Sequence, residues 1–232
     1  GELDPVKIAE GRYLSDEMAI SYGLLPRCNR GIFAVNELPD LAERIQVGLL
    51  NVLQERDIQI RGHKVRMPLD VLVVATANPE DYTNRGRIIT PLKDRYGAQI
   101  RTHYPLTARE EMQVMELERN VIDIEGYELK VPDFMTEIIA EVTRIARESP
   151  DVSQRSGVSV RASIANYETL IANAYRRAIQ AGEPEVVPRL SDLPYIISSL
   201  GGKLEFETFE EGREAQLMER FIEQAVDHAF KK

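Results

Sequence analysis

The hydrophobic pattern changes its period near Pro105, and this change limits the fold more than any other feature of the chain. Before Pro105, short apolar runs alternate with segments whose apolar residues recur every three or four positions. After Pro105, almost every apolar segment has the longer period. The short runs predict strands, and the longer period predicts amphipathic helices. We therefore expect an α/β part, residues 1–104, followed by an all-helical part, residues 105–232.

The first part contains the expected strands. Gly31–Val35 is a short apolar run that predicts a buried strand. Val71–Thr76 is almost wholly apolar, which is typical of a parallel strand covered by helices on both faces. Residues 57–67 predict a two-stranded hairpin with Gly62 in its turn. Ala98–Arg101 is a weaker strand candidate.

Apolar stripes predict the helices. Pro39 suits the first turn of one of them, and Thr107 with Glu110 has the spacing of a capping box at the start of another. The predicted helices are 39–56, 107–119, 132–148, 160–181 and 212–230.

The net charge of −9 comes entirely from the second part. Residues 1–104 contain 14 basic and 14 acidic side chains, whereas residues 105–232 contain 15 basic and 24 acidic ones. An acidic helical part argues against a nucleic-acid-binding surface there. A well-solvated helical surface is the simplest interpretation of this charge.

Several other classes are disfavoured. No segment approaches the roughly 20 apolar residues that a membrane-spanning helix needs. Residues Gly1–Asp4 have neither the basic nor the apolar character of a signal peptide, so we expect a cytoplasmic protein. Cys28 is the single cysteine, and the three histidines lie far apart, so the sequence predicts neither an internal disulfide nor a thiolate or histidine metal site.

Polar side chains follow both of the strongest strand candidates. Asn36 and Glu37 come directly after the first, and Asn78 comes after the second. Open α/β sheets bind their ligands at the carboxyl ends of the strands. A carboxylate and an amide at neighbouring strand ends can together orient an attacking water, which suits phosphoryl transfer.

Two arginines complete this set. Arg95 precedes the last strand candidate, and Arg161 lies at the start of a predicted helix. A guanidinium is permanently charged and fits phosphate oxygens. Taken singly, Glu37 is also explained as a first-turn helix residue, Asn78 as a turn residue and each arginine as half of a surface ion pair. The ordered set is what favours a phosphoryl-transfer site.

The ordered set resembles the second half of an AAA+ ATPase, in particular the magnesium-chelatase ATPase subunit and the MoxR-like group. Gly31–Leu38 resembles the Walker B strand, residues 57–67 the hairpin inserted before sensor 1, and Val71–Asn78 the sensor-1 strand. Leu92–Tyr96 resembles the arginine-finger segment, and Gly157–Ala162 the sensor-2 motif of the helical lid. The similarity runs from about residue 3 to about residue 180.

This resemblance implies a partial P-loop-type parallel sheet with a hairpin before sensor 1, followed by an all-helical lid. By the resemblance, Glu37 polarises the attacking water and Asn78 places it against the γ-phosphate of ATP. Arg161 reaches ATP from the lid of the same subunit, and Arg95 reaches it from the neighbouring subunit. Asn36 and Glu37 hold Mg²⁺ through water.

The same resemblance implies ATP and Mg²⁺ as cofactors and a ring, expected to be a hexamer. Hydrolysis of ATP would drive remodelling of a partner protein. The similarity to magnesium chelatase implies a partner with a metal-binding adhesion-type (VWA) domain. No membrane span and no nucleic-acid partner are expected.

Two features depart from the family pattern. Asn36 stands where the Walker B motif usually holds Asp, and an uncharged amide should hold the water shell of Mg²⁺ less firmly. No G-x-x-x-x-G-K-[ST] loop, the Walker A motif, occurs in the chain. The most similar segment is Gly201–Leu204, which lacks both the first glycine and the final Ser or Thr. We therefore expect a piece of a longer protein, with Walker A upstream of Gly1, and weak ATP binding by this 232-residue chain alone.

Three other functions fit parts of the pattern. Asn36 favours a non-hydrolysing AAA+ scaffold. The basic hairpin residues Arg56, Arg61, Lys64 and Arg66 favour a nucleic-acid motor, against which the acidic second part argues. Enhancer-binding transcription activators are less favoured, because the chain has no Gly-Ala-Phe-Thr-Gly-Ala loop.

Overall fold

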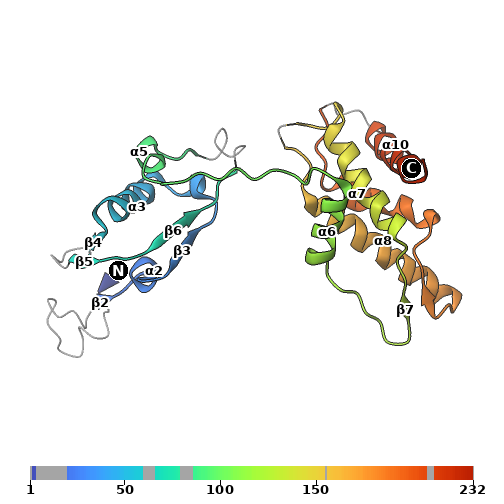
Figure 1. Cartoon of the computed structure of the whole chain (residues 1–232), viewed down its shortest axis with the longest axis horizontal. Coiled ribbons are helices and arrows are strands. Elements are labelled where there is room, and N and C mark those ends of the chain that lie inside the picture. Colours follow the sequence, from blue (N-terminus) through green and yellow to red (C-terminus); the bar gives the residue numbers. More distant parts are fainter. Residues whose placement is uncertain are drawn as a thin grey trace. The chain divides into compact units, whose positions relative to one another are not determined.

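The chain divides after Arg101 into two compact units, Gly1–Arg101 and Thr102–Lys232 (Figure 1). The computed structural model describes residues 2–3, 20–59, 66–78, 86–154, 156–207 and 212–231. The division falls close to Pro105, where the hydrophobic pattern changes. The assignment of residues 1–104 to an ATPase core and of residues 105–232 to a lid stays a prediction. Each unit is described by itself.

The first unit is built from short strands and helices. β1 pairs with β2 and β4 with β5 in antiparallel fashion, and β3 pairs with β6 in parallel. In chain order its elements are β1 (Glu2–Leu3), β2 (Ile20–Ser21), α2 (Leu24–Arg27), β3 (Ile32–Val35), the 3₁₀ turn η2 (Leu38–Asp40), α3 (Glu43–Glu55), β4 (Asp57–Gln59), β5 (Arg66–Pro68), β6 (Leu72–Ala75) and α5 (Thr90–Lys93).

The parallel pair of β3 and β6 is the centre of this unit, as the two apolar runs predict (Figure 1). One face of the pair packs against α3 and α5 through a small core that includes Val35, Leu38, Leu49 and Leu92. On the other face, Ile32, Leu72 and Val74 are 66%, 61% and 46% exposed. The prediction that β6 is covered on both faces is therefore wrong for the described residues, which cover one face only.

The hairpin is also present. β4 and β5 pair antiparallel, with Asp57 opposite Pro68 and Gln59 opposite Arg66. The backbone N–H of Leu69 donates to the carbonyl of Arg56, which closes the base of the hairpin beside the end of α3 (2.7 Å). The predicted turn around Gly62 lies outside the described residues, and so do Arg61 and Lys64.

Two other predictions for this unit are wrong. α3 begins at Glu43 rather than Pro39, because Pro39 lies in η2 and Leu41 after it is extended, with ψ of 130°. Residues 98–101 form no strand. A strand needs a hydrogen-bonded neighbour, and the described part of the chain supplies none for this segment, in which Ile100 is 88% exposed.

The second unit is mainly helical, and each of its predicted long helices is present with ends that agree within a residue. The parallel pair of β7 and β8, the 3₁₀ segment η3 and the short helix α9 were not predicted. Its elements are α6 (Ala108–Glu118), β7 (Glu128–Leu129), α7 (Asp133–Glu148), α8 (Val160–Ala181), β8 (Glu185–Val186), η3 (Leu190–Ile196), α9 (Ile197–Gly201) and α10 (Arg213–Phe230).

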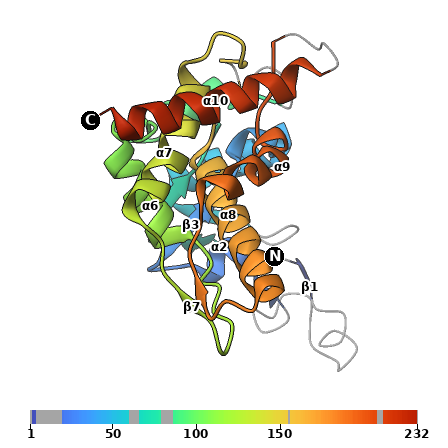
Figure 2. The ribbon, with the colours of Figure 1, turned by 90° about the vertical axis from the view of Figure 1, so that its right-hand side faces the viewer.

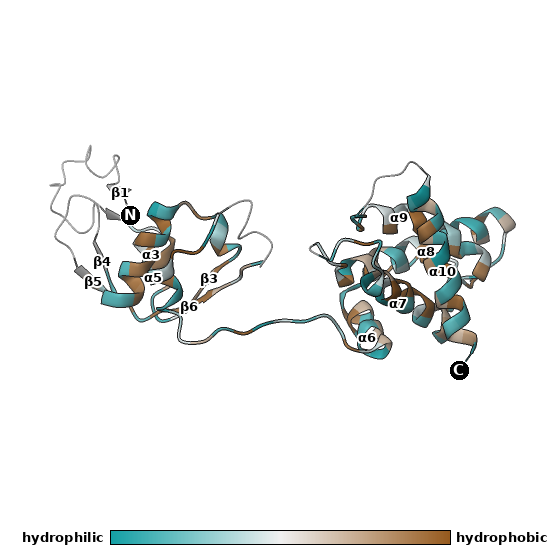
Figure 3. Cartoon of the chain, turned by 90° about the horizontal axis from the view of Figure 1, so that it is seen from above, coloured by the Kyte–Doolittle hydropathy of each residue, from teal (hydrophilic) through white to brown (hydrophobic). Residues whose placement is uncertain are grey.

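One apolar core holds these helices together. α7 packs against α6, α8 and α10 (Figure 2), and each of these helices turns an apolar stripe inward and a polar one outward (Figure 3). Met135, Ile138, Leu170 and Ile171 are at most 1% exposed. Each such side chain stabilises the fold by about 1.5–3 kcal/mol relative to an exposed one. The second unit therefore has a complete core of its own.

Helix ends in this unit are fixed by local signals. Thr107 and Glu110 form the predicted capping box at the start of α6. Gly182 ends α8 with φ of 68°, a conformation that glycine adopts without strain. Within the described residues, no helix is both long enough and apolar enough to cross a membrane.

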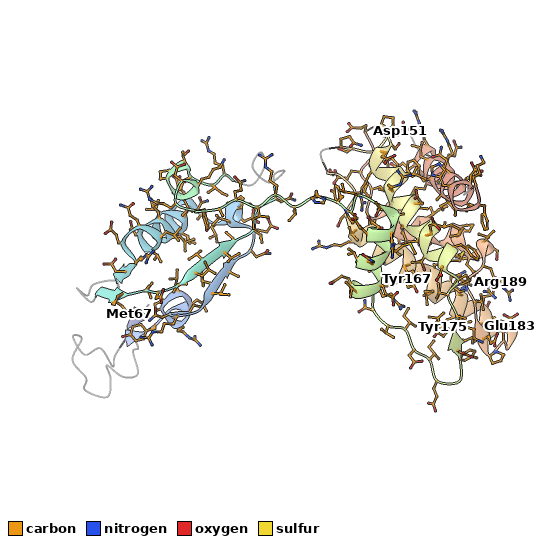
Figure 4. The ribbon with its side chains drawn as sticks, in the orientation of Figure 1. Met67, Asp151, Tyr167, Tyr175, Glu183 and Arg189 are labelled. Carbon is orange, nitrogen blue, oxygen red and sulfur yellow. The ribbon has the colours of Figure 1, made fainter. Side chains whose placement is uncertain are left out.

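The loop after α8 is held by a polar network. Asp192, only 2% exposed, accepts hydrogen bonds from the Asn173 side chain, from the Arg177 guanidinium and from the backbone N–H of Arg189. Arg189 also pairs with Glu183 at 3.0 Å, and these two residues are labelled in Figure 4. The network satisfies the hydrogen-bonding capacity of the buried Asp192 carboxylate, which therefore has a structural role.

Candidate functional site

The carboxyl ends of β3 and β6 lie side by side and carry three of the predicted site residues. Asn36 and Glu37 directly follow β3, and Asn78 follows β6. The backbone bonds continue past the strands, because the N–H of Thr76 donates to Val35 O and the N–H of Leu38 donates to Thr76 O (both 2.9 Å). The fold therefore brings these polar residues to one edge of the parallel pair, where α/β proteins bind ligands.

Glu37 has an unusual backbone and an unpaired carboxylate oxygen. Its φ and ψ are 51° and 60°, in the left-handed region that few residues other than glycine adopt. Its side chain is half-buried, and Oε2 is shielded from solvent and has no hydrogen-bond partner among the described residues. A shielded oxygen without a partner is unfavourable in a merely structural carboxylate. Glu37 therefore has one carboxylate oxygen whose hydrogen-bonding capacity no described residue satisfies.

Asn36 has one contact that bears on Mg²⁺. Its Oδ1 accepts a hydrogen bond from the Thr76 hydroxyl at 2.7 Å. One lone pair of the amide oxygen is therefore used, whereas the Oε2 atom of Glu37 has no hydrogen-bond partner among the described residues. Hydrated Mg²⁺ is held in proteins mainly by carboxylates. Glu37 fits such an ion, and Asn36 fits it less well. No cluster of three or more His, Cys, Asp or Glu side chains suited to a metal occurs in the described residues.

Asn78 lies after β6, outside any helix or strand, and is exposed. It is two residues beyond Thr76, which contacts both Asn36 and Glu37. Asn78 thus follows the same strand end in the chain, and its assigned role stays a prediction.

Arg95 lies just after α5, and its side chain is exposed. Its Nη2 donates to Gln54 Oε1 on α3 at 3.2 Å. This hydrogen-bond partner is a neutral amide and not a carboxylate. Next to it, burial raises the pKa of the Tyr96 phenol above its ordinary value. Tyr96 packs against the core of the first unit and stays neutral, which anchors the segment that carries Arg95.

Arg161 belongs to the second unit, at the second residue of α8. The Ser159 hydroxyl caps this helix by accepting from the Arg161 N–H at 3.2 Å. The side chain is exposed and forms no ion pair with any described residue. A positive charge is unfavourable beside a helix N-terminus, unless an anion binds there. The assigned contact of Arg161 with ATP stays a prediction.

A buried ion pair that the sequence did not predict holds the segment before Arg161. Arg147 on α7 contacts Glu111 on α6 through two hydrogen bonds of 2.7 and 2.8 Å. The Ser163 hydroxyl donates to the same carboxylate at 2.6 Å. Nε of Arg147 donates to the carbonyl of Val158, just before α8, at 2.7 Å. The one sequence signal for this cluster was the position of Glu111, which lies one helical turn before the buried Met115 on α6.

Loss of this ion pair is expected to destabilise the protein strongly. Arg147→Met leaves the carboxylate of Glu111, which is 2% exposed, without its cation, and should lower the free energy of unfolding by about 3–5 kcal/mol. Lys130→Met is the matched control and should cost less than about 1 kcal/mol, since Lys130 is half-exposed. Urea denaturation measures both variants. Equal losses of free energy of unfolding in the two variants would show that the buried ion pair contributes no more to stability than the exposed one.

The Walker A lookalike is excluded by its geometry. Gly201 is the last residue of α9, and the N–H of Lys203 donates to the Leu200 carbonyl at 2.9 Å. A phosphate-binding loop leads into a helix N-terminus, where backbone N–H groups are free. This segment instead follows a helix C-terminus, and cannot act in that way.

Comparisons with known proteins give a consistent class. Residues 9–93 match the family model described as the Sigma-54 interaction domain. Over 182 residues the chain is 26% identical to the uncharacterized protein YeaC of Bacillus subtilis (strain 168), covering 71% of this chain and 54% of that protein. Over 101 residues it is 31% identical to the magnesium-chelatase 38 kDa subunit of Cereibacter sphaeroides, covering 43% of this chain and 29% of that subunit.

Among solved structures, the crystal structure of NtrX from Brucella abortus superposes with a TM-score of 0.54 at 19% identity, covering 93% of this chain and 46% of that one. This likeness shows the fold alone, a mixed α/β arrangement with small parallel sheets and a helical C-terminal region. The chain spans about half or less of the length of these relatives.

The family match, the relatives and the fold together indicate an AAA+ ATPase-like module. More particularly, residues 9–93 are similar to the Sigma-54 interaction domain, and the chain has distant homology to the magnesium-chelatase 38 kDa subunit. The resemblance to that subunit inferred from the sequence is thus supported, and its extension to the MoxR-like group stays a prediction.

Proposed function

We propose that this chain contains part of the ATPase core and the helical lid of a cytoplasmic AAA+ ATPase. In that protein, hydrolysis of ATP drives remodelling of a partner protein. The observation that carries the proposal is the parallel pairing of β3 with β6, which brings Asn36, Glu37 and the segment leading to Asn78 to one edge. Enzymes of phosphoryl transfer need little besides such positioning and charge neutralisation.

In this proposal Glu37 is the residue that polarises the attacking water. The Oε2 atom of Glu37 supports the role, because it has no hydrogen-bond partner among the described residues and its lone pairs can accept a proton from a water that reaches it. Asn78 orients the same water. Mg²⁺, bound through water to Glu37 and more weakly to Asn36, would neutralise charge on the phosphates.

Two arginines act on the phosphate charge in this proposal. Arg161 contacts ATP from the same subunit, supported by its place at the N-terminus of α8. Arg95 contacts ATP from the neighbouring subunit of a ring, which we propose to be a hexamer. Its exposure and its weak contact with Gln54 leave the guanidinium available to a partner.

The partner is proposed by similarity to magnesium chelatase, and would carry a VWA domain. The match to the Sigma-54 interaction domain makes transcription activation a second candidate. The chain has no Gly-Ala-Phe-Thr-Gly-Ala loop, so remodelling of another partner is the function that we prefer. Binding of the complete protein to purified sigma-54 factor would favour the second candidate.

Phosphate release by the complete protein in which residues 1–232 occur tests hydrolysis itself. We expect ATP-dependent release that requires Mg²⁺, at a rate of about 1 per second or lower because Asn36 replaces a carboxylate. ATP binding without release would favour the non-hydrolysing scaffold. Release that requires DNA, with an affinity for DNA that falls steeply with salt, would favour the nucleic-acid motor.

A further inference from the structure

A threonine at the end of β6 contacts both residues of the Walker B-like pair. We propose that Thr76 is a positioning residue, whose hydroxyl holds Glu37 and Asn36 in the geometry that water activation needs. This inference rests on the proposed function of Glu37. Thr76 was not among the residues that the sequence suggested, because its contacts lie about 40 positions away along the chain.

The Thr76 hydroxyl is used both as donor and as acceptor. It donates its one proton to Asn36 Oδ1 at 2.7 Å, and it accepts the backbone N–H of Glu37 at 3.0 Å. Both lengths are those of well-formed hydrogen bonds. The Thr76 backbone adds bonds to Val35 and Leu38. One residue thus fixes the chain on both sides of Glu37.

The bond to the Glu37 N–H matters because the backbone there is strained. A left-handed residue other than glycine persists only where its surroundings hold it. Its side chain would move if the backbone relaxed to an ordinary conformation. Threonine suits the task, since its β-branch restricts rotation about χ1 and so keeps the hydroxyl in place. Thr76 is exposed, so its hydroxyl should affect local geometry much more than global stability.

The side chain of Asn36 is oriented by the same hydroxyl. Since Oδ1 accepts from Thr76, the second lone pair of Oδ1 and the amide nitrogen of Asn36 are the groups left for a ligand. An aspartate at this position would accept the same hydrogen bond through one carboxylate oxygen and keep the other free. The hydrogen bond from Thr76 can therefore form with either asparagine or aspartate at position 36. It does not depend on the replacement of the usual Walker B aspartate by Asn36.

Two substitutions separate the hydroxyl from the shape of the side chain. Thr76→Val keeps the β-branch and removes both hydrogen bonds, whereas Thr76→Ser keeps the hydroxyl. Thr102→Val is the matched control, because Thr102 is an exposed threonine outside the candidate site. All three proteins should melt at nearly the same temperature.

The first measurement is hydrogen exchange at the Glu37 amide in the complete protein, which does not depend on hydrolysis. Thr76→Val should speed this exchange about tenfold, since it removes the acceptor of that N–H, and Thr76→Ser should change it less than about twofold. Thr102→Val should leave it unchanged. Equal exchange in wild type and Thr76→Val overturns the inference.

The second measurement is phosphate release. Thr76→Val should lower kcat about tenfold with little change in KM for ATP, and Thr76→Ser should recover most of the rate. Faster exchange with an unchanged kcat would also overturn the positioning role. If the wild-type protein releases no phosphate, the proposed function fails, while exchange at Glu37 still decides whether Thr76 holds this residue.

Discussion

Glu37→Gln in the complete protein is expected to lower phosphate release by at least about 100-fold while leaving ATP affinity within about threefold of wild type. The amide has almost the shape of the carboxylate, but it cannot accept a proton from the attacking water. Binding of ATP depends on other groups, so a tight but inactive complex should accumulate. Single-turnover phosphate release and equilibrium nucleotide binding measure the two effects separately.

Glu43→Gln is the matched control, since Glu43 is an exposed glutamate in the first turn of α3. It should change neither turnover nor ATP affinity. An unchanged rate in Glu37→Gln would remove Glu37 from its assigned role. A loss of ATP binding as large as the loss of turnover would make Glu37 a binding residue instead.

The simpler explanation of Glu37, as a first-turn helix residue, does not fit the structure. Glu37 precedes a 3₁₀ turn rather than an α-helix, and its side chain makes no capping hydrogen bond. A structural role therefore leaves both the left-handed backbone and the unpaired Oε2 atom unexplained. Strained residues of this kind are concentrated at functional sites.

The sequence predicted the second unit well because its signals are local. The apolar stripes of α7 and α8, the capping box at Thr107 and the glycine at position 182 each act within a few residues. The same holds for the hairpin at β4 and β5. Helix ends could therefore be placed within a residue, without knowledge of what the helices pack against.

The remaining features depend on contacts between distant segments. One face of β6 is exposed because, among the described residues, elements pack against the other face only. The hydrophobic pattern of a single strand cannot show which of its faces is covered. The contacts of Thr76 with Asn36 and of Arg147 with Glu111 join residues 40 and 36 positions apart. For the candidate site, the order of motifs suggested which residues to consider, and the geometry of Thr76 had to come from the structure.

Arg95→Ala is expected to lower phosphate release by about 1,000-fold or more, because an arginine that reaches the transferring phosphate from a neighbouring subunit has effects of this size. ATP affinity should change much less, since the guanidinium stabilises charge that develops during the reaction. Arg101→Ala is the matched control, because Arg101 is an exposed arginine close by in the chain. It should retain the wild-type rate.

Mixing two inactive proteins tests whether Arg95 acts across a subunit interface. A subunit with Glu37→Gln keeps its Arg95, and a subunit with Arg95→Ala keeps its Glu37. In mixed rings some interfaces combine an intact Glu37 with an intact Arg95, so random mixing in equal amounts should restore about a quarter of the wild-type rate. If Arg95 acted on the ATP of its own subunit, every site would lack one of the two groups and no rate would return. A mixture as inactive as its components, in rings shown to exchange subunits, would therefore exclude the action of Arg95 on a neighbour.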